Sequence, residues 1–199
     1  MALNAEGYIS HIKGCISPAY ICDAGDGKAI SLSEKAFDAD GKPTIRKMSF
    51  PFTGRAFAVH LDLKNEKGHC PPLYRFLDDE AKPWAKRCDF VIFHQAATSV
   101  YAYLIECKSN SIAGPDIREQ LDAGMKWLRS LKKLIENYYG HQRTIKAQRF
   151  VFSTNTNPAA YLDAEGKYLK SDPAIRFYHY DQLAGLSLGE LENSQIESV

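Results

Sequence analysis

A carboxylate and an ammonium group end the most apolar strand-like stretch of this chain. Residues 100–105 read VYAYLI, and Glu106, Cys107 and Lys108 follow without a break. Because side chains alternate along a strand, Glu106 and Lys108 share one face, while Cys107 lies on the other and is predicted to be a core residue. A charge carried into an apolar interior must be paired, neutralised or bound to a metal ion. The stretch therefore predicts a site where charge is compensated.

A second carboxylate, Asp89, stands just before the preceding apolar run, FVIF. If the two runs pair as an antiparallel hairpin with Gln95 opposite Val100, Asp89 lies opposite Glu106. A slip of one residue would turn Asp89 to the other face. Two adjacent carboxylates need more positive charge than Lys108 alone supplies, and paired carboxylate oxygens suit Mg²⁺. This register predicts a metal site, and the alternative is a cross-strand salt bridge at a sheet edge.

Acid-x-Lys triplets occur at several places in the chain, so the triplet alone carries little weight. They lie at positions 26/28, 40/42, 62/64, 80/82, 106/108 and 165/167. Four of these six fall in turn-like segments and are expected to be solvated surface pairs. Of the remaining two, 62/64 and 106/108, only 106/108 has both an upstream strand Asp and a downstream amphipathic helix.

Periodicity predicts the elements that must position these groups. Strands are predicted at 88–94, 99–108, 147–155 and 174–180. Between the second and third strands, apolar residues recur at helical spacing over about 22 residues, with Pro115 suited to the first turn and Gly140 to the end. This order predicts an α/β fold with a mixed central sheet and a long crossover helix after the E-x-K strand.

The rest of the chain is expected to complete one domain over residues 1–190. Residues 1–85 are predicted as short strands and loops, 86–154 as the motif-bearing core, and 155–190 as a further strand region. The final stretch is rich in acids and lacks basic residues, so 191–199 is predicted to be a flexible tail. A length of 199 residues with 45% hydrophobic content suits a single core.

Composition indicates a protein that is neither exported nor inserted into a membrane. The N-terminus lacks a basic start followed by an apolar core, and no apolar run approaches the roughly 18 residues of a membrane span. The five cysteines are odd in number and scattered, which is typical of reduced thiols. A cytoplasmic location is expected.

Positive charge gathers on the predicted helix and the strand after it. Residues 115–149 hold eight basic and four acidic residues, whereas the whole chain has a net charge of +1. Lys126, Arg129 and Lys133 fall on one side of the helix and could follow a phosphate backbone. The alternative is that they form the solvated face of a packed helix.

The ordered segments KRCDFVIF, YAYLIECKSN and IREQLDAGMKWL, within residues 86–154, resemble the PD-(D/E)xK nuclease superfamily and its restriction-endonuclease-like fold. The resemblance implies that Asp89, Glu106 and the backbone carbonyl of Cys107 hold Mg²⁺ or Mn²⁺. It implies that Lys108 orients the attacking water or stabilises charge on the phosphate. It also implies that Gln120, on the helix, reaches the site; the alternative is a glutamine on the helix surface.

Two features depart from the pattern of this family. Cys88 stands where the motif has proline. Many members supply a further glutamate from an N-terminal helix, whereas residues 1–85 are predicted to be strands and loops. The candidates for that ligand are Glu34, Glu66 and Glu80.

These observations predict a Mg²⁺-dependent nuclease that acts on DNA in restriction, defence or repair. Cutting both strands of a duplex would be easier for a homodimer or with a partner subunit. The alternatives are a non-catalytic module that binds nucleic acid or a protein partner on the same fold, and an interaction subunit without nucleic-acid contact.

Overall fold

The computed structural model describes residues 3–37, 42–64, 70–72, 82–109, 112 and 115–199. The α-helices of this part are α1 (Ala5–Cys15) and α2 (Asp116–Tyr139). The strands are β1 (Ile21–Asp23), β2 (Ala29–Phe37), β3 (Pro43–Pro51), β4 (Arg55–His60), β5 (Phe90–Ala96), β6 (Ser99–Lys108), β7 (Ile145–Ser153), β8 (Tyr168–Leu169), β9 (Asp172–His179) and β10 (Glu197–Ser198). Short 3-10 turns lie at Pro18–Tyr20, Pro83–Ala85, Ala159–Tyr161, Tyr180–Leu183 and Leu188–Glu190.

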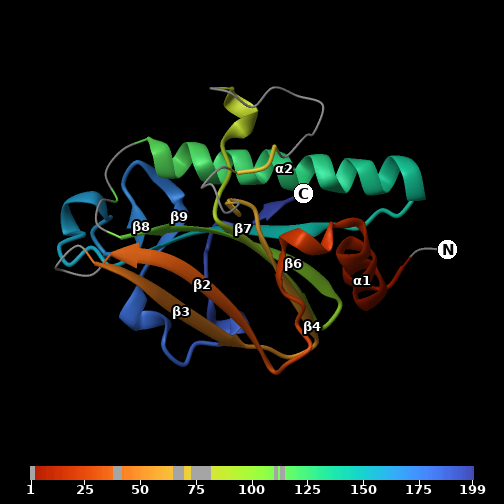
Figure 1. Ribbon diagram of the computed structural model, residues 1–199, viewed down its shortest axis with the longest axis horizontal. Helices are drawn as coiled ribbons and strands as arrows, with labels where there is room; N and C mark the ends of the chain where they lie inside the picture. Colours follow the sequence, from red (N-terminus) through yellow and green to blue (C-terminus); the bar gives the residue numbers. More distant parts are fainter. Residues whose placement is uncertain (1–2, 38–41, 65–69, 73–81, 110–111, 113–114) are drawn as a thin grey trace.

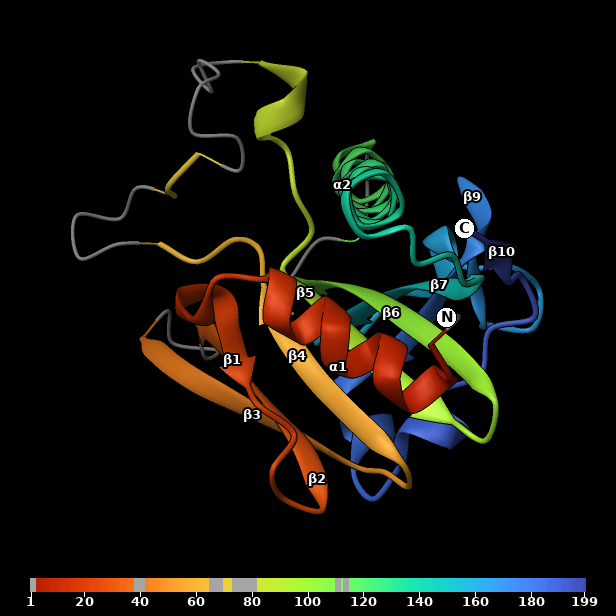
Figure 2. The same ribbon diagram turned by 90° about the vertical axis from the view of Figure 1, so that its right-hand side faces the viewer.

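A mixed sheet forms the middle layer of the molecule. Its strand order is β1-β4-β5-β6-β7-β9-β8, and β10 also pairs with β7. Helices α1 and α2 cover one face, and the β2–β3 ribbon covers part of the other (Figures 1 and 2). A buried apolar cluster fills the space on each side of the sheet. The predicted α/β class with a mixed sheet is therefore confirmed.

Strands β5 and β6 form the predicted antiparallel hairpin in the predicted register. Gln95 pairs with Val100, and the ladder continues without a shift to Phe90 and Ile105. Asp89 is the next residue outward on its strand, at the position that faces Glu106. The register therefore brings the two candidate carboxylates to the same end of the hairpin.

Helix α2 is the predicted crossover connection, since it joins the parallel strands β6 and β7. It begins after Pro115 and ends at Gly140, whose φ of 67° lies in the left-handed region that favours glycine at a helix end. Along its length α2 packs mainly on β6. In the part of the chain that the structure describes, no helix is long and apolar enough to cross a membrane.

Gly124 allows α2 to lie close to the sheet. A Cβ atom at this position would stand 2.5 Å from Cys88 Sγ and 3.0 Å from Leu104 Cδ2. Both distances are too short for a methyl group without movement of its neighbours. Gly124 lies about one turn after Gln120, so the same close packing helps to set how near Gln120 comes to β6.

Replacing Gly124 with alanine is expected to lower the free energy of unfolding by about 1–2 kcal/mol. The clash with Cys88 costs more than the roughly 1 kcal/mol that alanine gains over glycine in a helix. Denaturant unfolding of Gly124→Ala measures the change, and Gly14→Ala is a matched control because a Cβ at Gly14 meets nothing within 4 Å. Adding Cys88→Ala should relieve part of the clash. Equal stabilities of Gly124→Ala and wild type would contradict this account of the packing.

The structure corrects the prediction that residues 1–85 form a region of strands and loops without an N-terminal helix. Helix α1 lies in this region, and Asn4 caps it by accepting a 2.7 Å hydrogen bond from the backbone N–H of Gly7. Its buried residues, Ala5, Tyr8, Ile9 and Ile12, follow helical spacing. Gly7 and Gly14 lower the local helix preference, so the helix depends on packing of this apolar side against β4, β5 and β6.

The prediction of a flexible tail at 191–199 is wrong. Strand β10 pairs with β7, and Leu191 and Asn193 are buried. The Asn193 side chain donates hydrogen bonds to the carbonyls of Arg149 (2.9 Å) and Ala174 (3.0 Å). Acid-rich composition indicates solvation, but here the partners that hold the segment are backbone groups of distant strands.

Candidate functional site

Asp89 and Glu106 meet at one end of the β5–β6 hairpin. Asp89 immediately precedes β5, and Glu106 lies near the end of β6. Asp89 is only 8% exposed and Glu106 only 1%. Asp89 Oδ2 accepts a 2.6 Å hydrogen bond from the backbone N–H of Cys107, which ties the two strands together where the carboxylates meet.

Lys108 joins this pair from the same strand. Its Nζ lies 2.7 Å from Glu106 Oε1 and donates a 2.9 Å hydrogen bond to Gln120 Oε1 on α2. Lys108 thus bridges the strand that carries the carboxylate and the helix that covers it. The structure therefore brings together all four side chains that the sequence nominates, namely Asp89, Glu106, Lys108 and Gln120.

Burial disfavours the charged form of both carboxylates. The pKa of Asp89 is raised well above its ordinary value, first by burial and then by the Glu106 charge, while the hydrogen bond from Cys107 opposes the shift. Burial raises the pKa of Glu106 to about 7, although Lys108 acts in the opposite direction. One ammonium group therefore does not compensate the two acids, as the sequence predicts.

The arrangement fits a divalent cation. Lys108 contacts Glu106 Oε1, whereas Glu106 Oε2 is buried and has no hydrogen-bond partner in the described part of the chain. The carboxylate therefore has one buried acceptor atom that is not paired. Asp89, Glu106 and the Cys107 backbone supply the hard oxygens that Mg²⁺ prefers. Among the described residues no three His, Cys, Asp or Glu side chains form a ligand group. Further ligands would be backbone, water or phosphate oxygens, as is usual for Mg²⁺.

Glu34, one of the three candidates for an additional acid, interacts electrostatically with the site. Glu34, on β2, is half-buried, and its charge contributes to the raised pKa of Asp89. The pKa of Glu34 is itself raised, mainly by burial, and Lys108 is among the charges that oppose this. Glu66 and Glu80 lie outside the described residues. The ribbon on the second face of the sheet thus brings a carboxylate within electrostatic reach of the site.

Asp62 is a site residue that the sequence reasoning missed. It follows β4, and its charge raises the pKa of both Asp89 and Glu106. Asp62 accepts a 2.9 Å hydrogen bond from Cys70 and lies 3.7 Å from Lys64. The available signal in the sequence was the Asp62-x-Lys64 triplet, which ends an apolar strand as the Glu106-x-Lys108 triplet does.

An open hollow of about 430 Å³ adjoins the site. Its lining residues come from the ends of the sheet, the Pro83–Ala85 turn and the start of α2; they are Asp62, Ala85, Lys86, Arg87, Lys108, Asp116 and Gln120. Lys108 is one quarter exposed at this hollow. Asp89 and Glu106 do not line this hollow, and Lys108, which contacts Glu106, connects the hollow to the buried carboxylates.

The three basic residues that the sequence nominates on α2 are placed differently from one another. Arg129 forms an ion pair with Glu197 on β10, and Lys133 lies 3.7 Å from Glu136 on its own helix. Lys126 is exposed and lines a second hollow next to the Pro83–Ala85 turn. The row is thus partly engaged in ion pairs within the protein, and Lys126 is the member closest to the candidate site along the helix.

Comparisons of this chain with protein-family models, with curated proteins and with solved structures found no match.

Proposed function

We propose that this protein is a divalent-cation-dependent nuclease that hydrolyses phosphodiester bonds in DNA, on a restriction-endonuclease-like fold of the PD-(D/E)xK type. The observation that carries the proposal is the convergence of Asp89 and Glu106 beside Lys108, with Glu106 Oε2 buried and without a donor in the described structure. A buried acceptor next to a second carboxylate calls for a cation.

The fold supports this proposal. The E-x-K strand β6 lies in the middle of a mixed sheet, antiparallel to β5 and parallel to β7, and the long helix α2 makes the crossover. This is the arrangement that the resemblance implies. It places the acid before β5, the acid and lysine on β6, and the glutamine on α2 around one point.

Asp89 and Glu106, with the Cys107 carbonyl, would hold the cation. Mg²⁺ or Mn²⁺ bound there would polarise the scissile phosphate and lower the pKa of a bound water. The buried position of both acids strengthens every electrostatic interaction at that point, because little solvent screens it.

Lys108 would offset negative charge on the phosphate. Its ammonium group is held between Glu106 and Gln120, so its position is set before a substrate arrives. Gln120 positions Lys108 by accepting one of its three N–H groups, which leaves another donor for a phosphate oxygen. The partial exposure of Lys108 at the hollow gives the substrate access to it.

A direct test is to incubate the purified protein with supercoiled plasmid, single-stranded DNA and RNA, in the presence of Mg²⁺, of Mn²⁺ and of EDTA. The expected result is cleavage of DNA that requires the divalent cation and that EDTA stops. A Glu106→Gln preparation purified in parallel controls for contaminating nucleases.

The other outcomes separate the alternatives. Gel retardation of nucleic acid without cutting under any condition would favour a non-catalytic binding module. If the protein neither cuts nor retards any of these nucleic acids, a nucleic-acid function is rejected. Metal-dependent cutting of RNA but not DNA would keep the chemistry and change the substrate.

A further inference from the structure

Apart from the two hollows near α2, a pocket lies on the sheet face opposite α2. It encloses about 590 Å³, within the range of small-molecule sites, and its walls come from β5, β6, β7, β8, β9 and the C-terminal segment 189–196. Tyr101 and Tyr103 project into this region from β6, on the face opposite that of Glu106. Tyr101 also lies five residues before Glu106, roughly 16 Å along an extended strand. The pocket is therefore separate from the candidate nuclease site.

Most polar groups in the wall already have partners. His94 Nε2 lies 2.9 Å from the carbonyl of Thr53, and His94 Nδ1 lies 3.3 Å from the Tyr103 hydroxyl. Tyr168 accepts a 2.9 Å hydrogen bond from the backbone N–H of Ser194. These contacts hold the walls in place.

Among the described lining residues, Gln148 combines burial with an unpaired side-chain oxygen. It lies on β7, is only 5% exposed, and its Oε1 atom is buried without a hydrogen-bond partner in the described part of the chain. Buried amides are normally paired, and an unpaired one costs about 1–3 kcal/mol. Because the terminal torsion of glutamine is broad, a small turn presents either end of the amide to the pocket. A ligand in the pocket could therefore supply the hydrogen-bond partner that the Gln148 amide lacks.

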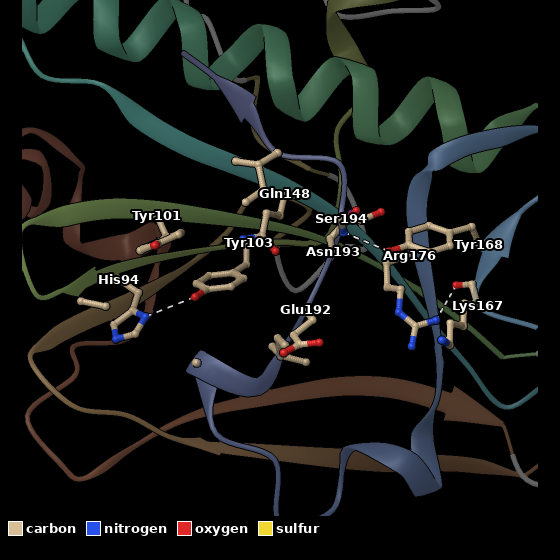
Figure 3. A pocket seen from close by; sticks show the side chains of 14 residues that line it. His94, Tyr101, Tyr103, Gln148, Lys167, Tyr168, Arg176, Glu192, Asn193 and Ser194 are labelled. Carbon is tan, nitrogen blue, oxygen red and sulfur yellow. Dashed lines mark hydrogen bonds between the residues drawn. The ribbon is translucent and has the colours of Figure 1, made fainter. Parts of the chain in front are cut away.

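Charge is distributed unevenly around the pocket. Figure 3 shows Lys167 and Arg176 on one side and His94 and Tyr101 on the other. The Arg176 guanidinium donates to the carbonyl of Lys167 (2.7 Å) and lies over the rings of Tyr168 and Tyr178, and no described carboxylate lies within 4 Å of it. Lys167 forms an ion pair with Glu165 (3.0 Å), so on this side of the pocket Arg176 carries the positive charge that no described carboxylate pairs within 4 Å.

The remaining lining residues complete the chemical description. Glu192 is an exposed carboxylate that lies between the two sides in Figure 3, where it favours hydrogen-bond donors and disfavours an anion in the middle of the pocket. Tyr101 and Tyr103 stack on each other with ring centres 6.2 Å apart and line the side away from Arg176. A complementary ligand has an anion at one end, hydroxyl or amino donors in the middle, and a planar group at the other end.

We propose that this pocket binds a nucleotide, with its phosphate at Arg176 and Lys167, its sugar hydroxyls near Glu192, and its base against the tyrosines with an edge hydrogen-bonded to Gln148. The nucleotide is either a free nucleoside monophosphate or the phosphorylated end of a strand. Aromatic side chains accept bases of any sequence by stacking, and an amide pairs with a base edge. The inference holds whether or not the protein cuts nucleic acid, because it uses none of the residues of the nuclease site.

Isothermal titration calorimetry in EDTA, where no cleavage is expected, tests this proposal. The ligands are the ribo- and deoxyribonucleoside 5′-monophosphates, the matching nucleosides, inorganic phosphate, and short oligonucleotides with and without a 5′-phosphate. At least one monophosphate is expected to bind at least tenfold more tightly than its nucleoside and than inorganic phosphate. Binding confined to 5′-phosphorylated oligonucleotides would support the same ligand chemistry from a strand end.

Two variants and one control locate the binding. Gln148→Met has a similar volume and removes an unpaired buried amide, so it should keep or raise the melting temperature while weakening nucleotide binding at least tenfold. Arg176→Gln should weaken the monophosphate at least tenfold and leave nucleoside binding unchanged. Lys28→Gln removes an exposed positive charge outside this pocket and outside the nuclease site, so it should change nothing. The proposal is overturned if no nucleotide binds at millimolar concentration, if phosphate alone binds equally well, or if Gln148→Met and Arg176→Gln bind as wild type does.

Discussion

Replacing Glu106 with glutamine is expected to reduce DNA cleavage by on the order of 1,000-fold or more. The substitution keeps the size of the side chain and removes the charge that faces Asp89, so the cation loses one of its two side-chain ligands. A 1,000-fold loss corresponds to about 4 kcal/mol of transition-state energy, which is the upper end of the typical cost of removing one electrostatic group. Single-turnover cleavage of a labelled duplex at saturating Mg²⁺ measures the effect.

The neighbouring residues should follow a graded order. Asp89→Asn is expected to match Glu106→Gln, because the two acids act on the same ion. Lys108→Met should lower the rate by roughly 100-fold. Gln120→Leu should lower it by about tenfold, since Gln120 acts through the position of Lys108.

Glu165→Gln is a matched control for this series. Glu165 and Lys167 form the same E-x-K spacing and an ion pair of 3.0 Å, but on the exposed surface. Its cleavage rate should equal that of wild type. A Glu106→Gln protein that folds and cuts at the wild-type rate would exclude Glu106 from the catalytic site.

The metal-free protein is expected to lose stability as the pH rises from about 5 to 8. The pKa of Glu106 is raised to about 7 in the folded state, so the folded protein holds a proton that the unfolded chain releases near its ordinary pKa. The contribution of Glu106 to the free energy of unfolding is fully present below the pKa that Glu106 has in the unfolded chain, and it is lost as the pH rises through about 7. Asp89, whose pKa is also raised, acts in the same direction.

Glu106→Gln should remove the part of this pH dependence that Glu106 contributes, whereas Asp89 keeps its own part because burial is the main cause of its raised pKa. At pH 8 in EDTA the variant should be more stable than wild type by roughly 2–3 kcal/mol, because it no longer buries a charge. Thermal unfolding followed by circular dichroism between pH 5.5 and 8.5 measures both proteins. If the variant is instead less stable at pH 8, the ion pair with Lys108 outweighs the cost of burial.

Addition of Mg²⁺ gives a second comparison on the same proteins. At pH 8 the cation should raise the melting temperature of wild type, because it binds the folded state and compensates the buried carboxylates. Glu106→Gln and Asp89→Asn should show little of this shift. This measurement reports on cation binding without requiring any cleavage.

The sequence by itself determined the hairpin and the crossover helix, and it offered a register that pairs the two acids, which the structure then confirmed over a one-residue slip. These elements rest on local patterns. A two-residue turn at Ala97 and Thr98 joins two apolar runs and sets their register, and φ of Ala97 is 50°, as the tight hairpin turns require. Once that register holds, alternation alone places Asp89 and Glu106 together.

Only the tertiary structure decided the surroundings of this pair. Asp62 and Glu34 come from separate strands, and their electrostatic contact with the site depends on how β4 and the β2–β3 ribbon pack. The side chain of Gln120 could have faced solvent or the sheet, and the close approach of α2 at Gly124 decided in favour of Lys108. Helix propensity and charge pattern do not predict how close Asp62, Glu34 and Gln120 lie to the acid pair and Lys108.

The pocket lined by Gln148 and Arg176 could not be predicted from the sequence, for the same physical reason. Its wall includes the segment that composition assigned to a flexible tail, and Asn193 anchors that segment through the carbonyls of two distant strands. Nothing in the sequence distinguishes Gln148 from other strand residues, and its buried, unpaired amide oxygen is visible only in the folded structure. Local sequence determines which elements form, whereas unpaired groups and cavities arise only where several elements meet.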